Sequence, residues 1–286
     1  MRGAVRARPL IVIGAARSGT NMVRDLLTSV IGYATWPCDE INPIWRHGNR
    51  GHLDDELAPG QATTAVRRYV RARFDRISRR SRAGVVVEKT CANSLRVAFV
   101  DRVLPDARFV VIERDGYDAV ASALQRWHAS LDLSYTLRKA RYVPITDVPS
   151  WAWRFLRLRA GRGIANERPL PSWGPRFAGM DTALRTQPLP TVAALQWARC
   201  VARSRADLAA LPPERVHWLG YERLVVQPSA VVGDLLEWCG VNPEPRQVGH
   251  LTAGIRRDRI GHGREQLGQR TLADIAPIID QVGAAT

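Results

Sequence analysis

The fold is decided by the segment PLIVIGAARSGTN at residues 9–21. It opens with a continuous apolar run, which is typical of a strand buried on both faces of a sheet. Gly14 and Gly19 let the backbone turn sharply and bring its N–H groups near an anion, at the start of a helix expected over residues 20–31. Arg17 adds a fork of donors inside the turn. The segment therefore predicts a phosphate-binding loop, with a plain strand–helix turn as the alternative.

This loop differs from that of the P-loop ATPases and kinases, whose pattern is G-x-x-x-x-G-K-[ST]. The two glycines are correctly spaced, but Thr20 stands at the lysine position and Asn21 at the position of the Mg²⁺-binding hydroxyl. A nucleotide bound here is expected to need no metal, and no metal site is predicted. A P-loop-like nucleotide kinase and a non-catalytic nucleotide- or polyanion-binding module remain the alternative functions.

The rest of the chain alternates strands with helices, which predicts an α/β fold with a parallel sheet flanked by helices. Further strands are expected at residues 84–87, 108–112 and 216–219, and helices at 62–80, 93–104, 116–127, 190–210, 228–239 and 271–282. Two stretches interrupt this rhythm. Residues 128–190 are expected to be a partly helical insertion, and residues 253–270 a mobile basic loop. We expect residues 1–286 to form a single domain.

A second anion site is predicted where Arg114 follows the strand at residues 108–112. Ligands of open α/β sheets bind at the carboxyl ends of the strands. Ser122 and Arg126 lie four residues apart on the following helix and therefore share a face. Together with Arg114 they make an anion-binding cluster beside the phosphate loop.

These two motifs resemble those of the PAPS-dependent sulfotransferases, in style closest to the protein-tyrosine sulfotransferases and to bacterial enzymes that act on glycans or small metabolites. The resemblance implies a P-loop-like sulfotransferase fold and the co-substrate 3′-phosphoadenylyl sulfate (PAPS), with no metal. It implies that the first loop holds the 5′-phosphosulfate and the second cluster the 3′-phosphate. The nucleotide-binding residues that it implies are Arg17, Ser18, Gly19, Thr20, Asn21, Arg114, Ser122, Arg126, Tyr221 and Arg264.

The resemblance also implies two catalytic residues, Glu40 and Lys89. Lys89 closely follows the strand at residues 84–87 and is one of only two lysines in an arginine-rich chain, which favours a role for a compact charge. A lysine at this strand end lies near the transferred sulfuryl group in related enzymes, and Glu88 beside it is either its partner or solvated. Glu40 matches a general base found in a Cys-x-Glu context. The alternative bases are Asp39, His47 and His52.

Composition narrows the remaining possibilities. The net charge of +15 reflects either contact with anions or an arginine-rich codon usage. A nucleic-acid partner is not expected because no recognised module is present, whereas contact with a membrane surface stays open. No apolar run reaches the roughly 18 residues of a membrane span. Four widely spaced cysteines predict neither a disulfide framework nor a zinc site, which fits the cytoplasm.

The acceptor side is expected to be lined by residues 32–60 and 128–190. Both stretches contain tryptophans, which stack well on sugar faces, and a basic cleft suits an anionic glycan. We therefore expect sulfuryl transfer to a hydroxyl of a saccharide, a glycolipid or another small molecule. Nothing in the sequence predicts an oligomeric state. The tryptophans expected on this side are Trp36, Trp45, Trp127, Trp151, Trp153 and Trp173.

Overall fold

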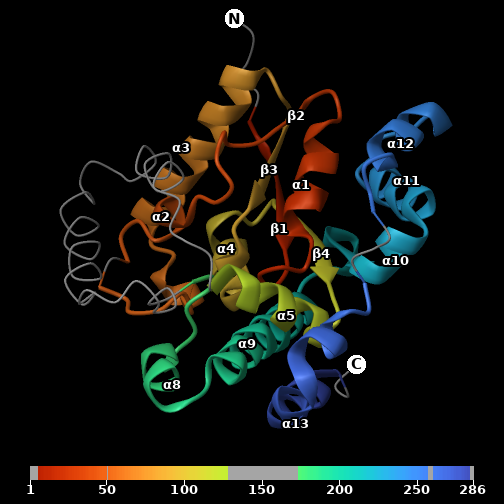
Figure 1. The fold of residues 1–286 in the computed structure, drawn as a ribbon. Helices are drawn as coiled ribbons and strands as arrows, with labels where there is room; N and C mark the ends of the chain where they lie inside the picture. The colour runs from red at the N-terminus through yellow and green to blue at the C-terminus, as the bar shows by residue number, and fades with distance from the viewer. Residues whose placement is uncertain (1–5, 50, 128–172, 257–259, 284–286) are drawn as a thin grey trace, which may run out of the picture.

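The computed structural model describes residues 6–49, 51–127, 173–256 and 260–283. Within these residues, five parallel strands form one sheet in the order β2-β3-β1-β4-β5 (Figure 1). The strands are β1 (Arg8–Ile13), β2 (Tyr33–Ala34), β3 (Val85–Lys89), β4 (Arg108–Glu113) and β5 (Val216–Gly220). Because all strands run the same way, their carboxyl ends meet at one edge of the sheet.

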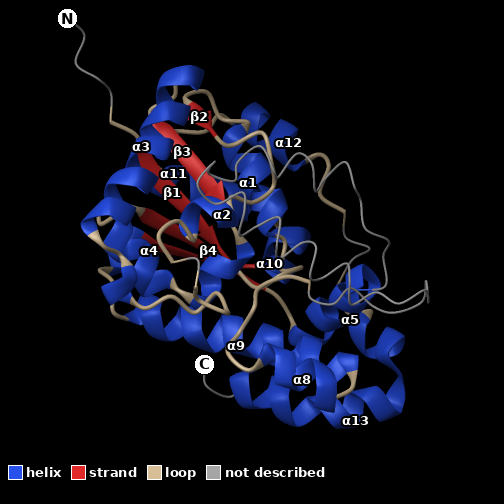
Figure 2. Ribbon diagram, turned by 90° about the vertical axis from the view of Figure 1, so that its left-hand side faces the viewer, coloured by secondary structure: helices blue, strands red, loops and turns tan. Residues whose placement is uncertain are grey.

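Helices cover both faces of the sheet, and Figure 2 shows β3, β1 and β4 side by side among them. Leu10 and Val12 of β1 face α1 (Thr20–Thr28), α10 (Tyr221–Val226), α11 (Pro228–Trp238) and α12 (Pro245–Thr252). Ile11 and Ile13 face α3 (Thr64–Ser81) and α4 (Val97–Val103). This alternation of side chains explains why the apolar run of β1 is continuous.

A third group of helices packs below the sheet in the view of Figure 1. It contains α5 (Gly116–Trp127), α9 (Leu189–Ala209) and α13 (Gly263–Gly283), whose apolar side chains share a buried cluster. The short helix α8 (Met180–Thr186) precedes α9. Since α5 follows β4 directly, this group supports the carboxyl edge of the sheet.

The predicted parallel α/β architecture is confirmed, with corrections in two places. The stretch 32–60, for which no strand or helix was predicted, contains two short elements: Tyr33–Ala34 pairs with β3 as the edge strand β2, and Asn42–Trp45 forms the helix α2. The helix expected over 93–104 is split into a 3₁₀ turn at Cys91–Leu95 and the helix α4. The strand β2 and the helix α2 are too short to leave a periodic pattern in the sequence.

Most of the expected insertion, residues 128–172, lies outside the described residues. Its end contains the helix α8, in keeping with a partly helical segment, and α9 begins at Leu189. The expected loop over 253–270 is wrong from Gly263 onward, where α13 begins. Buried Leu267 and Ile275 anchor this helix on α5 and α9, although Gly268 (φ 70°) kinks it. The helix α12 was not predicted.

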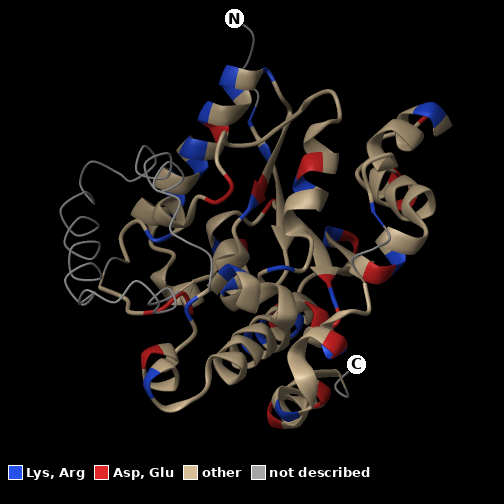
Figure 3. Ribbon diagram, in the orientation of Figure 1, with Lys and Arg blue, Asp and Glu red and all other residues tan. Residues whose placement is uncertain are grey.

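Basic residues recur along α3, where the ribbon of Figure 3 is repeatedly blue. One turn of that helix after another exposes arginine, while Val66, Val70 and Phe74 point into the core. In the described part of the chain, no helix is long and apolar enough to cross a membrane.

Candidate active site

The loop between β1 and α1 is shaped by two residues with positive φ, Arg17 (71°) and Gly19 (90°). A Cβ added to Gly19 would lie 2.6 Å from a ring carbon of Tyr221, and one on Gly14 would lie 2.7 Å from the Ile112 carbonyl oxygen. Glycine is therefore required at both positions. The Ser18 hydroxyl is buried and makes no hydrogen bond to any described residue. Such an unsatisfied buried donor fits a loop that binds an anion.

The second cluster touches this loop directly. Arg17 Nε donates to Ser122 Oγ at 2.9 Å, and Arg114 Nη1 donates to the Arg17 carbonyl oxygen at 3.0 Å. The Arg114 guanidinium also lies over the ring of Tyr221, 4.5 Å from its centroid. Four of the predicted nucleotide-binding residues thus meet at one point of the sheet edge. The others nearby include Asn21 and Arg126, which are exposed on the first turn of α1 and the last turn of α5.

Glu40 and Lys89 are in contact although 49 residues separate them, with Lys89 Nζ donating to Glu40 Oε1 at 3.2 Å. The same oxygen accepts the backbone N–H of Cys91 at 3.3 Å. The Cys91 thiol lies 3.6 Å from the Thr20 hydroxyl of the phosphate loop. The Glu40–Lys89 pair is therefore adjacent to that loop.

Lys89 carries its charge in a buried position, with 4% of its side chain exposed. Burial by itself opposes the charge, but the adjacent Glu40 carboxylate outweighs it, so the pKa of Lys89 is raised above its ordinary value. Burial raises the pKa of the Cys91 thiol to about 11, so this thiol is neutral. A fixed positive charge beside an anion loop suits the stabilisation of negative charge.

The alternative bases are engaged elsewhere. Asp39 Oδ1 pairs with Arg24 Nη1 at 3.2 Å, and His52 Nδ1 lies 3.2 Å from Asp54 Oδ1. His47 stacks on Tyr69 with ring centroids 3.7 Å apart. Of the four candidates, Glu40 is the one that contacts Lys89.

Glu88 is not solvated, because its carboxylate is fully buried, and it hydrogen-bonds to Thr90 and Asn93, whereas Lys89 donates to Glu40. The Glu88 carboxylate accepts the Thr90 hydroxyl at 2.5 Å and Asn93 Nδ2 at 2.9 Å. Burial raises the pKa of Glu88 to about 7. Thr90 Oγ1 in turn accepts the backbone N–H of Ile41 at 3.1 Å, so this chain of contacts holds the residue next to Glu40.

A buried arginine extends the same network beneath the loop. Arg96 donates from Nε to Asn93 Oδ1 at 2.9 Å and from Nη2 to Asn42 Oδ1 at 2.6 Å, and its Nη1 lies 3.6 Å from Asp55. Burial lowers the pKa of Arg96 to about 10, which leaves it charged at neutral pH. Although burial opposes it, the Arg96 and Arg46 charges lower the pKa of Asp55. Sequence reasoning missed this network; its one signal is a charged Arg96 between apolar neighbours.

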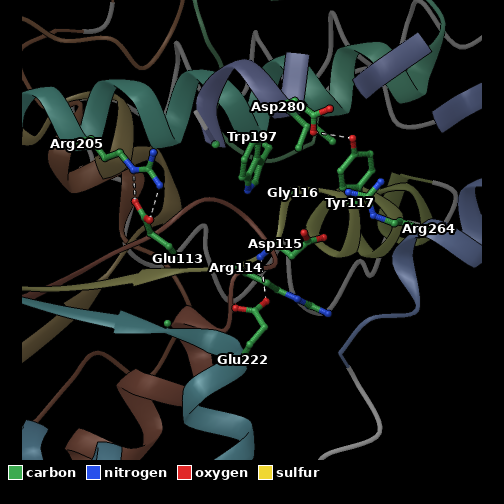
Figure 4. A pocket seen from close by; sticks show the side chains of 13 residues that line it. Glu113, Arg114, Asp115, Gly116, Tyr117, Trp197, Arg205, Glu222, Arg264 and Asp280 are labelled. Atoms are coloured by element: carbon green, nitrogen blue, oxygen red, sulfur yellow. Dashed lines mark hydrogen bonds and ion pairs between the residues drawn. The ribbon is translucent and has the colours of Figure 1, made fainter. Parts of the chain in front are cut away.

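A pocket of about 390 Å³ lies beside Arg114, between α5, α9, α10 and α13 (Figure 4). Arg264 from α13 lies over the Tyr117 ring at 3.6 Å, and the Tyr117 hydroxyl donates to Asp280 at 2.9 Å. Glu222 accepts the backbone N–H of Asp115 at 3.0 Å. The structure thus brings Arg264 to the pocket that Arg114 lines. Among the described residues, no group of three or more His, Cys, Asp or Glu could hold a metal ion.

Three of the six tryptophans expected to line an acceptor cleft are core residues. Trp36, Trp45 and Trp127 are buried, and the first two pack edge-on against Phe74. Their apolar contacts explain why they lie inside rather than on a sugar-binding surface. Trp173 is half-buried against Trp127. Trp151 and Trp153 lie outside the described residues.

The sequence itself places the chain in a family. A family model described as the sulfotransferase family matches residues 9–168, more than half of the chain. The protein is therefore a member of the sulfotransferase family and an enzyme of that class. No curated protein matched the sequence.

Solved structures share the fold. The sulfotransferase STF9 from Mycobacterium avium superposes with a TM-score of 0.53 at 15% identity, over 96% of this chain and 77% of that one. The sulfotransferase domain of the olefin synthase of Synechococcus PCC 7002 gives 0.50 at 14% identity, over 98% and 89%. The sulfotransferase STF1 from Mycobacterium tuberculosis H37Rv gives 0.50 at 13%, over 97% and 76%. These likenesses support the fold alone.

Proposed function

We propose that this sulfotransferase takes the sulfuryl group from PAPS and transfers it to a hydroxyl of an acceptor, with Glu40 as the general base. The observation that carries the proposal is the contact of Glu40 with Lys89 at 3.2 Å, beside Thr20 of the phosphate loop. A base, a fixed cation and an anion loop then meet at one edge of the sheet. A non-catalytic binding module would need neither of the first two.

The donor side consists of two anion sites. We propose that the loop from Arg17 to Asn21 binds the 5′-phosphosulfate, with the Ser18 hydroxyl and the amides at the start of α1 as donors. Arg114, Ser122 and Arg126 would bind the 3′-phosphate. Tyr221 supports this site from below the Arg114 guanidinium, and Arg264 would add a charge from α13.

The chemistry is an in-line displacement at sulfur. Glu40 takes the proton of the acceptor hydroxyl while its oxygen forms a bond to sulfur, and the bond from sulfur to the leaving phosphate oxygen breaks. Lys89 and Arg17 stabilise the negative charge that grows on the leaving oxygen. Glu40 is a stronger base once Lys89 turns from its carboxylate toward that oxygen, so the two residues act in sequence.

For the acceptor we propose a saccharide or a glycolipid hydroxyl. The buried tryptophans give this choice no support, so it rests on charge: the net charge of +15 and the arginines of α3 favour an anionic acceptor. The long segment that carries Glu40 packs against α3 through His47 and Tyr69. An anionic acceptor bound near Glu40 would therefore be close to this basic helix.

The test is transfer of labelled sulfate from PAPS in the presence of EDTA, using a panel of anionic saccharides, glycolipids, phenols and simple alcohols. Sulfated saccharide or glycolipid product would support both halves of the proposal. PAP should raise the melting temperature with or without divalent metal. Stabilisation by ATP–Mg²⁺ but not by PAP would favour the kinase alternative, and PAP binding without transfer to any acceptor would favour the binding module.

A further inference from the structure

The carboxylate of Asp118 joins three parts of the chain at the nucleotide side of the site. It lies in the first turn of α5 and is buried, with 4% exposure. Its Oδ2 accepts the backbone N–H of Gly261 at 2.8 Å, and its Oδ1 accepts that of Gly263 at 2.6 Å. Oδ2 also lies 3.6 Å from Arg114 Nη2. One side chain therefore connects Arg114 to the start of α13.

The Asp118 carboxylate is not needed to cap the helix α5, because Asp115 does so. Asp115 Oδ1 accepts the backbone N–H of Asp118 at 2.9 Å and so caps the first turn of α5. The Asp118 side chain itself extends from α5 to the chain that enters α13.

Gly263 lies directly against the backbone of α5. A Cβ at this position would fall 2.5 Å from the Asp118 nitrogen and from the Tyr117 carbonyl carbon. Only glycine allows this approach, and it brings the next residue, Arg264, over the Tyr117 ring. The close contact and the two hydrogen bonds hold the same segment by different means.

We propose that Asp118 is a positioning residue for nucleotide recognition, a step that rests on the proposed function. It orients the Arg114 guanidinium toward the 3′-phosphate and holds residues 260–264 beside it, so that Arg264 reaches the same pocket. Asp118 does not touch the nucleotide. Its carboxylate is fixed by two backbone N–H groups, and this makes it a rigid reference for a guanidinium that also contacts the Arg17 carbonyl and the Tyr221 ring.

The test compares Asp118→Asn with the wild type in binding PAP and AMP, which differ by the 3′-phosphate. Asparagine removes the charge and places an amide group against two N–H donors. The preference for PAP over AMP should fall about tenfold, as expected for one lost charge-assisted contact. Amide hydrogen exchange at Gly261 and Gly263 should become faster. A merely structural role would change the exchange and the melting temperature but not the preference.

Asp207→Asn is the matched control. Asp207 is also nearly buried, accepts a backbone N–H, from Ala98 at 3.0 Å, and pairs with an arginine four residues earlier, Arg203 at 3.2 Å. It lies on α9 beside α4, so its replacement should leave the PAP preference unchanged. An equal loss of preference in both variants would attribute the effect to general destabilisation and overturn the proposal.

Gly263→Ala keeps the test decisive even if Asp118→Asn folds poorly, and a double variant tests the route of the effect. Gly263→Ala displaces the same segment while leaving the carboxylate intact, and it should also lower the PAP preference. If Asp118→Asn folds, it should cause a smaller loss in the Arg114→Ala background than in the wild type, because only its effect through residues 260–264 remains there. Fully additive losses would show that Asp118 does not act through Arg114 and would overturn the proposal.

The outcomes also separate this proposal from the proposed function. A wild-type protein that binds PAP and AMP equally would show that the 3′-phosphate site is wrong, and both proposals would fall. A wild-type preference that survives in Asp118→Asn and Gly263→Ala would overturn the role of Asp118 alone.

Discussion

The two halves of the candidate site are held in place by different kinds of structure. The donor half, where β1 and β4 end, consists of a turned backbone and arginines that directly follow buried strands. The transfer half, where β3 ends, places Glu40 on a long segment that has little regular structure. That segment is held by buried polar side chains, from Glu88 through Thr90 to Ile41 and from Arg96 to Asp55.

This difference indicates which property a substitution in each half should change. Strand ends are fixed by the sheet, so single changes in the donor half should alter affinity and leave the fold intact. The transfer half depends on a buried network in which the loss of one partner leaves others unsatisfied. Changes there should alter turnover, or stability, more than nucleotide binding.

The largest expected effect tests the transfer half directly. Glu40→Gln is nearly isosteric and removes the base, so turnover should fall by roughly 10²–10⁴. PAP affinity should stay almost unchanged, because the donor half is untouched. Steady-state kinetics with a cognate acceptor and titration with PAP measure the two quantities.

Glu56→Gln is the control for this variant, since Glu56 lies on the same segment and accepts the Ala178 N–H. Lys89→Ala should also depress turnover, because its charge is needed as the leaving oxygen becomes negative. Wild-type turnover in Glu40→Gln would show that the base lies elsewhere and that the transfer half is wrongly assigned.

The next effect concerns the buried network. The pKa of Glu88 is raised to about 7, so the protonated carboxyl favours the folded state. Its contribution to stability is full below the ordinary pKa of 4.5 and is lost as the pH rises through 7. Glu88→Gln cannot ionise. Relative to the wild type, its free energy of unfolding should therefore rise between these pH values, by up to about 3 kcal/mol.

Urea unfolding at a series of pH values measures this difference. The exposed Glu237 supplies the control, because Glu237→Gln should run parallel to the wild type. A Glu88→Gln profile that is also parallel would mean that Glu88 is ionised throughout. PAP affinity should not change in Glu88→Gln, because the buried network supports the transfer half and not the donor half.

A smaller effect is expected in the donor half. Arg114→Ala should weaken PAP binding by about 1.5–3 kcal/mol, because one charge-assisted contact to the 3′-phosphate is lost. AMP binding should change little. Calorimetric titration of both nucleotides checks this, with Arg223→Ala as the control on an exposed arginine nearby. Equal weakening of PAP and AMP binding would show that Arg114 does not contact the 3′-phosphate.

The donor half was the part that could be predicted from the sequence. Arg17, Gly19 and Arg114 follow strands whose central residues are apolar, and in a parallel sheet neighbouring strand ends meet. The contact of Arg17 with Ser122 follows from that geometry. In this part of the site, the local sequence pattern that predicts the strands also predicts which residues lie close together.

The rest depended on burial, which a single sequence does not display. Glu88 looks like a charged strand end and is instead fully buried. Trp36 and Trp45 occur among polar residues and nevertheless pack into the core on Phe74. Residues 253–270 were expected to form a loop, whereas α13 begins at Gly263 and the burial of Leu267 on α9 and α5 outweighs the cost of its kink. In each case a tertiary contact overrides the local signal.

The smallest expected effect separates Asp39 from its neighbour Glu40. The Asp39 side chain is 45% exposed and pairs with Arg24 at 3.2 Å, whereas Glu40 contacts Lys89. An exposed ion pair contributes about 0.2–1 kcal/mol, so Asp39→Asn should change stability by no more than that. Turnover and PAP affinity should remain close to wild type, because Arg24 keeps Asp25 as a second partner. Kinetics of Asp39→Asn and Glu40→Gln with the same acceptor make the test. A loss of turnover in Asp39→Asn as large as that in Glu40→Gln would assign the base to Asp39, and it would mean that the Glu40–Lys89 contact only shapes the site.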